Sequence, residues 1–302
     1  MTPGLLPPVL EHSTVLRSVI ESLPEDDSFK AEDDGPVFIL ASGFRSGSTL
    51  TQRLVMSEGA LIWGEPFMET GWLHGLATTL MHLPGRLHGW AEIQRKLQRG
   101  PLHDQWVSNL HPGVQQLRHA HCAMIQTLLA DPTRKTPYTR WGAKFVRLDG
   151  NFARYLQWLF PNARFIICVR DPLASFHSYR RYLPDYATDP QQSGWMVTPN
   201  WRINTAERFF AIAHHLMGSL IEAQAENPNA MTLLRYEDMM SGKSRISALG
   251  DWLGMHLKSE VLDQKLDGAM RQASPEAPLT ETEKATIDVW NPRFKAFGYG
   301  AP

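Results

Sequence analysis

The strongest structural pattern in this sequence lies at residues 36–50, PVFILASGFRSGSTL. It opens with a short apolar run, passes through a turn that contains Gly43 and Gly47, and enters a helical pattern at Ser48. A strand, a glycine-rich turn and a helix start in that order form an anion site. The first N–H groups of a helix have no intrahelical partner, and the helix dipole favours negative charge there. The sequence therefore predicts a site for a phosphate-sized group.

The basic residue of this turn is placed differently from that of ordinary ATP-binding loops. Those loops have a lysine directly after the last glycine, whereas here Ser48 follows Gly47 and the basic residue is Arg45. The run resembles the 5′-phosphosulfate-binding loop of sulfotransferases that use 3′-phosphoadenosine 5′-phosphosulfate (PAPS), with Phe44 where many members have proline. A generic glycine- and serine-rich turn is the alternative. The resemblance implies that the donor is held by Arg45, Ser46, Gly47, Ser48 and Thr49.

Strand-like runs alternate with helical patterns along the rest of the chain, which favours a parallel sheet covered on both faces. We expect a P-loop-type α/β fold, a three-layer sandwich whose central parallel sheet has about five strands. The expected strands span 37–41, 60–63, 140–147, 164–169 and 231–236. Helices are expected at 8–22, 113–130, 150–160, 201–226, 243–253 and 258–270, with a loop at 183–199.

A second basic motif follows the fourth expected strand. Arg170 would end this strand, Asp171 and Pro172 would begin the next helix, and Ser178 lies eight residues after Arg170. From those places an arginine and a hydroxyl can both reach a phosphate. By itself the pair could be a surface charge and an ordinary helix serine. In this order after the first loop it matches the 3′-phosphate-binding motif of PAPS sulfotransferases.

Glu65 and Lys144 are the remaining candidates for chemistry. Glu65 follows the second expected strand, and its carboxylate can accept a proton from an acceptor hydroxyl. The place resembles that of the catalytic glutamate in tyrosylprotein sulfotransferases and related bacterial enzymes, rather than the histidine of the cytosolic enzymes. Lys144 lies in a W-G-x-K-like segment. The resemblance implies that Arg45, and secondarily Lys144, stabilises charge on the leaving oxygen.

Two further donor contacts are implied by the resemblance alone. Tyr236 belongs to an R-Y-E-D segment that closes the fifth strand in the family. Ser274 lies where relatives fold a serine-containing loop over the nucleotide. Both are assigned to nucleotide binding.

The composition adds exclusions. The 30 basic and 31 acidic residues of the 302-residue chain give no basic field, so neither nucleic acid nor a membrane surface is an expected partner. No secretory leader pattern and no membrane-span-length apolar run occurs, and we expect a cytoplasmic protein. Seven histidines between 74 and 121 match no compact metal-ligand spacing, and no metal is expected. Of the two cysteines, Cys168 is expected to be buried.

The expected organisation is one sulfotransferase domain over 1–302, with an N-terminal helix and linker at 1–35 and a helical insertion at 67–118 that lines the acceptor site. The expected reaction moves the sulfuryl group of PAPS, the co-substrate, to a hydroxyl of a small molecule or carbohydrate. Alternatives are a peptide tyrosine sulfotransferase, a P-loop nucleotide kinase and a non-catalytic nucleotide-binding protein.

Overall fold

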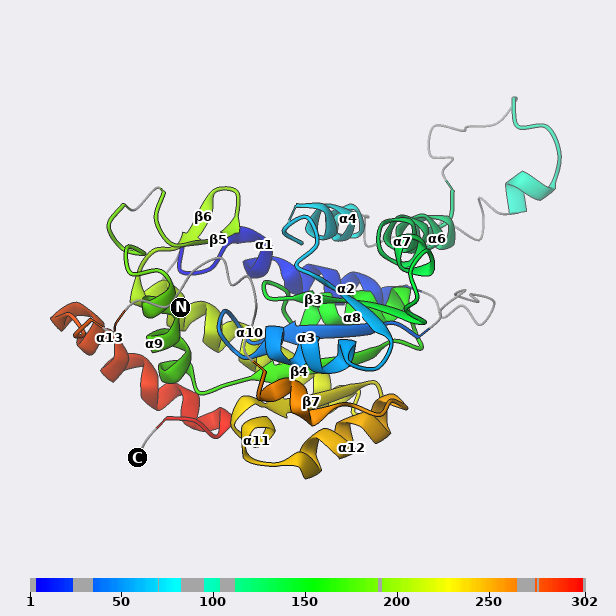
Figure 1. Ribbon diagram of the computed structural model, residues 1–302. Coiled ribbons are helices and arrows are strands. Elements are labelled where there is room, and N and C mark those ends of the chain that lie inside the picture. The colour runs from blue at the N-terminus through cyan, green and yellow to red at the C-terminus, as the bar shows by residue number, and fades with distance from the viewer. Residues whose placement is uncertain are drawn as a thin grey trace.

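A computed structural model of the chain describes residues 4–23, 35–69, 71–82, 95–103, 112–189, 192–264, 275 and 277–300. Its central feature is one five-stranded parallel sheet (Figure 1). The strand order is β2-β3-β1-β4-β7, with β1 (Val37–Ala41), β2 (Ala60–Gly64), β3 (Arg140–Phe145), β4 (Arg164–Val169) and β7 (Met231–Arg235). The expected α/β fold with a parallel sheet of five strands is confirmed.

The apolar run of β1 explains its central position. All five of its residues are buried, because both faces of the strand are covered. Phe38 and Leu40 lie on one face of the sheet, and Val37 and Ile39 lie on the other, as the alternation of side chains along a strand requires. The two faces of the strand therefore contribute to two separate hydrophobic clusters.

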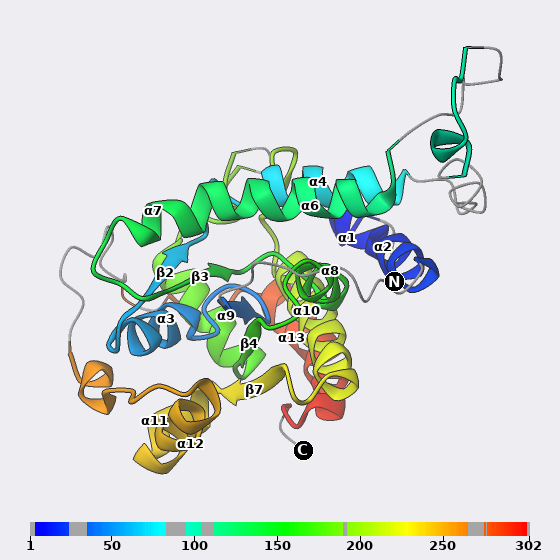
Figure 2. The ribbon, with the colours of Figure 1, turned by 90° about the vertical axis from the view of Figure 1, so that its right-hand side faces the viewer.

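Helices form the two outer layers, and Figure 2 shows the sheet between them. The cluster of Phe38 and Leu40 includes residues of α2 (Ser13–Ser22), α8 (Gly150–Leu159) and α10 (Ala206–Glu226). The cluster of Val37 and Ile39 includes residues of α3 (Ser48–Met56), α11 (Tyr236–Ser241) and α12 (Lys243–Leu253). Cys168 is buried in this second cluster, as expected.

The segment 183–203 differs from the prediction. It contains a two-stranded antiparallel hairpin, β5 (Trp195–Thr198) and β6 (Trp201–Ile203), where a loop and a helix start were expected. The longest helix, α10, begins only at Ala206, because the Thr205 side chain accepts a hydrogen bond from the Arg208 amide and so caps it. The hairpin packs on α9 (Pro172–Tyr182), where the Tyr179 hydroxyl donates to the Ile203 carbonyl at 2.6 Å.

Two helix ends also differ from the prediction. The helix expected at 113–130 passes through a π-helical turn and ends at Arg134, so that Asp131 and Pro132 continue it. Pro132 has no N–H to donate, and it follows the π-helical turn, where the regular i→i−4 hydrogen-bond pattern is already interrupted. Of the helix expected at 258–270 the structure describes a short 3₁₀ turn, and 265–270 lie outside the described residues.

The remaining elements are α1 (Pro8–Glu11), α4 (Trp72–Met81), α6 (Val114–Ile125), η2 (Gln126–Ala130), α7 (Asp131–Arg134), η3 (Ser259–Leu262), α13 (Glu281–Trp290) and η4 (Asn291–Phe297).

The strand register decides where the candidate residues lie. Gly64 pairs with Lys144, Ala41 with Cys168 and Val169 with Arg235, so the five strands end at one edge of the sheet. Ligands of open α/β sheets bind at this carboxyl edge. None of the described helices is both long enough and apolar enough to cross a membrane.

Candidate active site

The loop after β1 needs glycine at position 47. Gly47 has a φ of 91°, in the left-handed region, and is the N-cap residue directly before α3. A Cβ atom at this position would lie 2.5 Å from Cδ2 of Tyr236, so the Tyr236 ring also excludes any side chain there. Arg45 has a positive φ of 67° as well, a strained backbone for a residue with a side chain.

Two arginines from separate motifs meet at this loop. Arg45 Nε donates to Ser178 Oγ at 3.0 Å, and the Arg45 guanidinium lies 4.6 Å from the centroid of the Tyr182 ring. Arg170 Nη1 donates to the Arg45 carbonyl at 3.0 Å, and its guanidinium lies 4.2 Å from the Tyr236 ring centroid. Four residues predicted from three separate segments, Arg45, Arg170, Ser178 and Tyr236, therefore lie together.

The charges of these arginines are not balanced by carboxylates. Within the described residues neither Arg45 nor Arg170 forms an ion pair. Burial lowers the pKa of Arg45; Tyr182 opposes this change, and the positive charge of Arg170 adds to it. The Nε of Arg170 and the hydroxyl of Ser46 are buried and have no hydrogen-bond partner in the described part of the chain. Unpartnered donors and uncompensated cations beside a helix N-terminus fit an anionic ligand.

Glu65 lies at the other side of the loop, just after β2. Its backbone is left-handed, with a φ of 46°, and its amide donates to the Lys144 carbonyl at 2.9 Å. Its carboxylate forms ion pairs with Lys144 Nζ at 2.7 Å and with Arg147 Nη1 at 2.9 Å. Burial alone would raise the pKa of Glu65, but these two cations and their hydrogen bonds outweigh it and lower the pKa. Glu65 is therefore a carboxylate at neutral pH.

Lys144 connects Glu65 with the loop. Its ammonium group, on a side chain only 7% exposed, lies 2.7 Å from Glu65 Oε1 and 3.4 Å from Thr49 Oγ1. Thr49 stands in the first turn of α3. One cation thus contacts both the candidate base and the anion-binding loop.

Two charged residues of this network were not assigned from the sequence. Arg147 was predicted only as the last residue of the strand expected at 140–147, which ends at Phe145 in the structure, and Glu69 was not predicted at all. Glu69 is fully buried, and its Oε2 lies 3.3 Å from Arg147 Nη1. Arg147 carried a signal, because it lies three residues after Lys144 where β3 reaches the carboxyl edge. Glu69 carried none.

A cleft of about 400 Å³ joins these groups. At one side it is lined by basic side chains, and at the other by aromatic and apolar ones. Phe44 and Trp195 pack with ring centroids 4.3 Å apart, so that the hairpin closes the aromatic side. The basic lining is Arg45, Arg53, Lys144 and Arg170; the aromatic and apolar lining includes Phe44, Val146, Tyr182 and Trp195.

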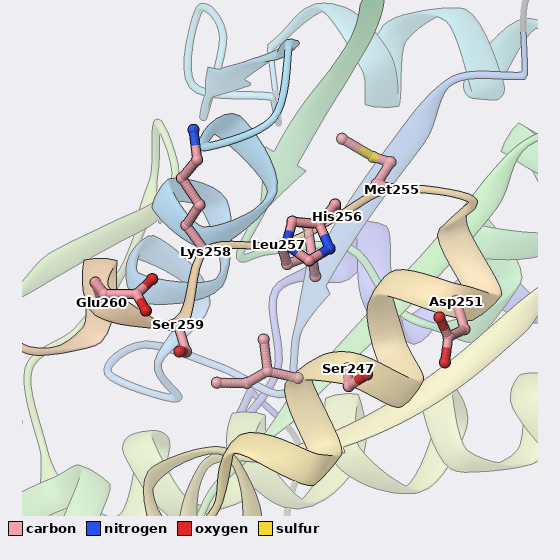
Figure 3. A pocket seen from close by; sticks show the side chains of 9 residues that line it. Ser247, Asp251, Met255, His256, Leu257, Lys258, Ser259 and Glu260 are labelled. Carbon is pink, nitrogen blue, oxygen red and sulfur yellow. The ribbon is translucent and has the colours of Figure 1, made fainter.

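Another pocket lies between α12 and the segment 255–260 (Figure 3). It is smaller, about 230 Å³, and its lining holds two carboxylates, Asp251 and Glu260, against the single lysine Lys258. The Lys258 ammonium lies 2.9 Å from Glu58 Oε1, so its charge is already paired. This lining does not suit a phosphate group.

Most sequence-predicted site residues border the cleft between the arginines and Glu65. The lining includes Arg45, Gly47, Ser48, Thr49, Glu65, Lys144, Arg170 and Tyr236. Ser46 lies buried in the same loop and Ser178 contacts Arg45, whereas Ser274 lies outside the described residues. A role of 67–118 in acceptor binding stays a prediction. Within the described ranges, no group of three or more His, Cys, Asp or Glu side chains is placed to hold a metal ion.

Comparison with known proteins identifies the family. A family described as the sulfotransferase family matches residues 36–259, well over half of the chain. The chain belongs to the sulfotransferase family, and it is an enzyme, a sulfotransferase. No curated protein matches it.

Three similar solved structures have sulfotransferase titles. The sulfotransferase domain of the Synechococcus PCC 7002 olefin synthase is 17% identical with a TM-score of 0.47, covering 92% of this chain and 100% of that one. Sulfotransferase STF1 from Mycobacterium tuberculosis H37Rv is 13% identical with a TM-score of 0.45, covering 95% and 84%. Sulfotransferase STF9 from Mycobacterium avium is 16% identical with a TM-score of 0.42, covering 98% and 85%.

Proposed function

We propose that this sulfotransferase transfers the sulfuryl group of PAPS to a hydroxyl of a small molecule or carbohydrate. The observation that carries the proposal is the meeting of Arg45 and Arg170, two partly buried cations without carboxylate partners in the described structure, at the N-terminus of α3. PAPS carries anionic groups at both its 5′ and 3′ ends, and two arginines from separate strand ends suit such a ligand.

The residues divide between the two ends of the donor. The α3 N-terminus, the Ser46 hydroxyl and Arg45 would bind the phosphosulfate, since they surround the loop that precedes Ser48. The unpartnered Nε of Arg170, together with Ser178, would bind the 3′-phosphate. Tyr236 would contact the nucleotide, because its ring borders the cleft beside Arg170.

The acid–base and electrostatic roles follow from the Glu65 network. Bound PAPS supplies an activated sulfuryl group. Glu65 is ionised and can accept the proton of the acceptor hydroxyl, while Lys144 and Arg45 face the loop where negative charge on the leaving oxygen would be stabilised. Lys144 lies against Thr49 and Glu65 together, so it can serve the leaving oxygen without leaving the base.

The aromatic side of the cleft supports a ring-bearing acceptor. Phe44, Tyr182 and Trp195 border the space next to Glu65, and such side chains stack on sugars and aromatic rings alike. A peptide tyrosine remains the alternative acceptor. Transfer of radiolabelled sulfate from PAPS to 2-naphthol, to a monosaccharide and to a tyrosine-containing peptide separates these classes.

The donor assignment is tested by isothermal titration with 3′-phosphoadenosine 5′-phosphate, the product nucleotide, and with ATP plus magnesium. We expect binding of the bisphosphate that is indifferent to magnesium. Arg170→Ala should weaken it about 10- to 100-fold, the effect of losing a hydrogen bond to a charged group, and Ser178→Ala about 3- to 10-fold. Arg154→Ala and Ser22→Ala, which remove side chains outside the cleft, are the controls.

The competing functions predict other results. A nucleotide kinase would prefer ATP with magnesium and would not respond to Ser178→Ala. A non-catalytic binding protein would bind the bisphosphate yet transfer no sulfate to any acceptor. Equal affinities of wild type, Arg170→Ala and Ser178→Ala would show that the donor site has been misassigned.

A further inference from the structure

We propose that Arg147 and Glu69 form a buried clamp that orients the Glu65 carboxylate, and that both act as positioning residues for the reaction. This inference rests on the proposed function, because it concerns the candidate base of that reaction. It adds two residues that neither the donor-binding motifs nor the W-G-x-K-like segment includes.

Arg147 is fixed on several sides. Its side chain is 5% exposed, and Nη1 contacts Glu65 Oε2 at 2.9 Å and Glu69 Oε2 at 3.3 Å. Its Nε donates to the Met196 carbonyl of β5 at 2.9 Å, and its guanidinium lies 5.1 Å from the Phe44 ring centroid. An arginine held in this way cannot follow Glu65 if the carboxylate rotates, so it fixes the direction in which Oε2 points.

The Glu69 carboxylate bonds a backbone amide beyond the end of β2 and so holds Arg147 to the sheet. The β2–β3 pairing ends at Gly64, and the chain turns away after the Glu65 amide has bonded to the Lys144 carbonyl. The Val146 amide, which follows β3 on the side facing β2, therefore has no β2 carbonyl to bond. It donates to Glu69 Oε1 at 2.7 Å instead. One carboxylate oxygen thus completes the edge of β3, and the other meets Arg147. Only an acidic side chain accepts at both oxygens.

The two carboxylates share Arg147, and Glu65 also pairs with Lys144. Lys144 and Arg147 face Glu65, whereas Glu69 is fully buried and contacts Arg147 alone of the two. Burial raises the pKa of Glu69, Arg147 opposes this rise, and the charge of Glu65 adds to it. The nearby His74 of α4 stays neutral, because burial lowers its pKa to about 4; Asp149 opposes this and Arg147 adds to it.

The two cations are suited to different tasks. Lys144 also contacts Thr49 of the donor loop, and a flexible ammonium can shift toward charge that develops there. Arg147 is tied to Glu69 and Met196 and stays with Glu65. Through its bond to the Met196 carbonyl, Arg147 also links Glu65 to the β5–β6 hairpin, whose Trp195 lines the cleft.

Titration of the glutamate carboxyl carbons by NMR tests the clamp without an acceptor. In ¹³C-glutamate-labelled protein, Glu65→Gln and Glu69→Gln identify the two resonances, and we expect one to titrate below and one above the usual range for glutamate. Arg147→Gln should raise the pKa of Glu65 by about one pH unit or more, the effect of losing an adjacent cation, and should raise that of Glu69 as well. Arg147→Lys, which keeps the charge but not the fork, should give a smaller change.

Controls separate this inference from the proposed function. Arg154→Gln, which removes an arginine paired with Glu222 and Glu226, should move neither resonance. Affinity for 3′-phosphoadenosine 5′-phosphate should stay within about twofold in Arg147→Gln and Arg147→Lys, because Arg147 is not among the residues that line the cleft with Arg45 and Arg170. Wild-type titration of Glu65 in both folded Arg147 variants would overturn the clamp, even with nucleotide binding intact. Failure of wild type to bind the nucleotide would overturn the proposed function and leave the titration result standing.

Discussion

Two parts of the site use positive charge in opposite ways: an arginine side around Arg45 and Arg170, and a glutamate side around Glu65. Around the loop after β1, Arg45 and Arg170 contact one hydroxyl, one carbonyl and two aromatic rings, and no carboxylate among the described residues. Beside β2 and β3, Lys144 and Arg147 are both paired with Glu65. Cations that lack a counter-ion gain most from an anionic ligand, whereas paired cations mainly set the orientation and ionisation of their carboxylate.

Under the proposed function, the arginine side would bind the donor and the glutamate side would accept the proton. Substitutions on the arginine side should change nucleotide affinity, and substitutions on the glutamate side should change turnover or titration. A residue that changed both equally would break the division. Lys144 is the residue that joins the sides, through Thr49.

Glu65→Gln should have the largest effect. We expect sulfuryl transfer to the best acceptor of the 2-naphthol, sugar and peptide panel to fall about 10²- to 10⁴-fold, the usual contribution of a positioned general base. Affinity for 3′-phosphoadenosine 5′-phosphate should be kept, since Glu65 faces Lys144 and Arg147 rather than the arginine side. The two values come from initial rates and isothermal titration. Loss of nucleotide binding together with turnover would contradict the division.

Arg45→Ala should weaken nucleotide binding about 10- to 100-fold, as expected for one lost hydrogen bond to a charged group. The matched control is Arg147→Ala on the glutamate side, which should leave the affinity within about twofold. Isothermal titration of both variants with the bisphosphate gives the comparison. Equal losses in the two arginine variants would mean that the cleft binds anions by overall charge alone.

The two sides also differ in how far the sequence predicts them. Arg45, Arg170 and Ser178 belong to local motifs with fixed spacing, and their meeting follows from strand ends that share one edge of a parallel sheet. Glu69 has no such signal, because its role depends on β2 ending one residue before Glu65 and leaving the Val146 amide to be bonded by a side chain.

In the fold, too, the elements with a local sequence pattern were predicted, and an element whose position depends on tertiary contacts was missed. The buried strands were predicted because a short, continuous apolar run bounded by turn residues is typical of a buried strand, as in β1. The β5–β6 hairpin was missed, because its strands are short and its position depends on bonds to α9, such as Tyr179 with Ile203. Its arrival beside Phe44 is what gives the cleft its aromatic side.

Gly47→Ala tests whether the arginine side depends on the loop backbone. The new methyl group would lie 2.5 Å from the Tyr236 ring at a φ of 91°, and we expect a loss of about 1 to 2 kcal/mol in the free energy of unfolding. Gly75→Ala is the matched control: its Cβ has no heavy atom within 4 Å, and it lies inside α4, where alanine should be neutral or stabilising. Urea unfolding measures both. Equal losses of unfolding free energy in the two variants would show that position 47 does not specifically require glycine.

The smallest expected effect is the pH dependence of stability on the glutamate side. The pKa of Glu65 is lowered in the folded protein, so its ionised form stabilises the fold above its unfolded pKa, and this contribution is lost as the pH falls through the folded value. The difference in unfolding free energy between wild type and Glu65→Gln should therefore shrink below about pH 4.5, by about 1 kcal/mol or less, since the carboxylate is partly exposed. Because the charge of Glu65 also raises the pKa of Glu69, the same difference is measured in a Glu69→Gln background, which removes the Glu69 titration from both proteins. Arg45→Met provides the contrast from the arginine side: arginine does not titrate, so its stability difference from wild type should be constant between about pH 3 and pH 8. A pH-dependent difference for Arg45→Met, or a constant one for Glu65→Gln, would show that the two sides do not differ in charge pairing as described.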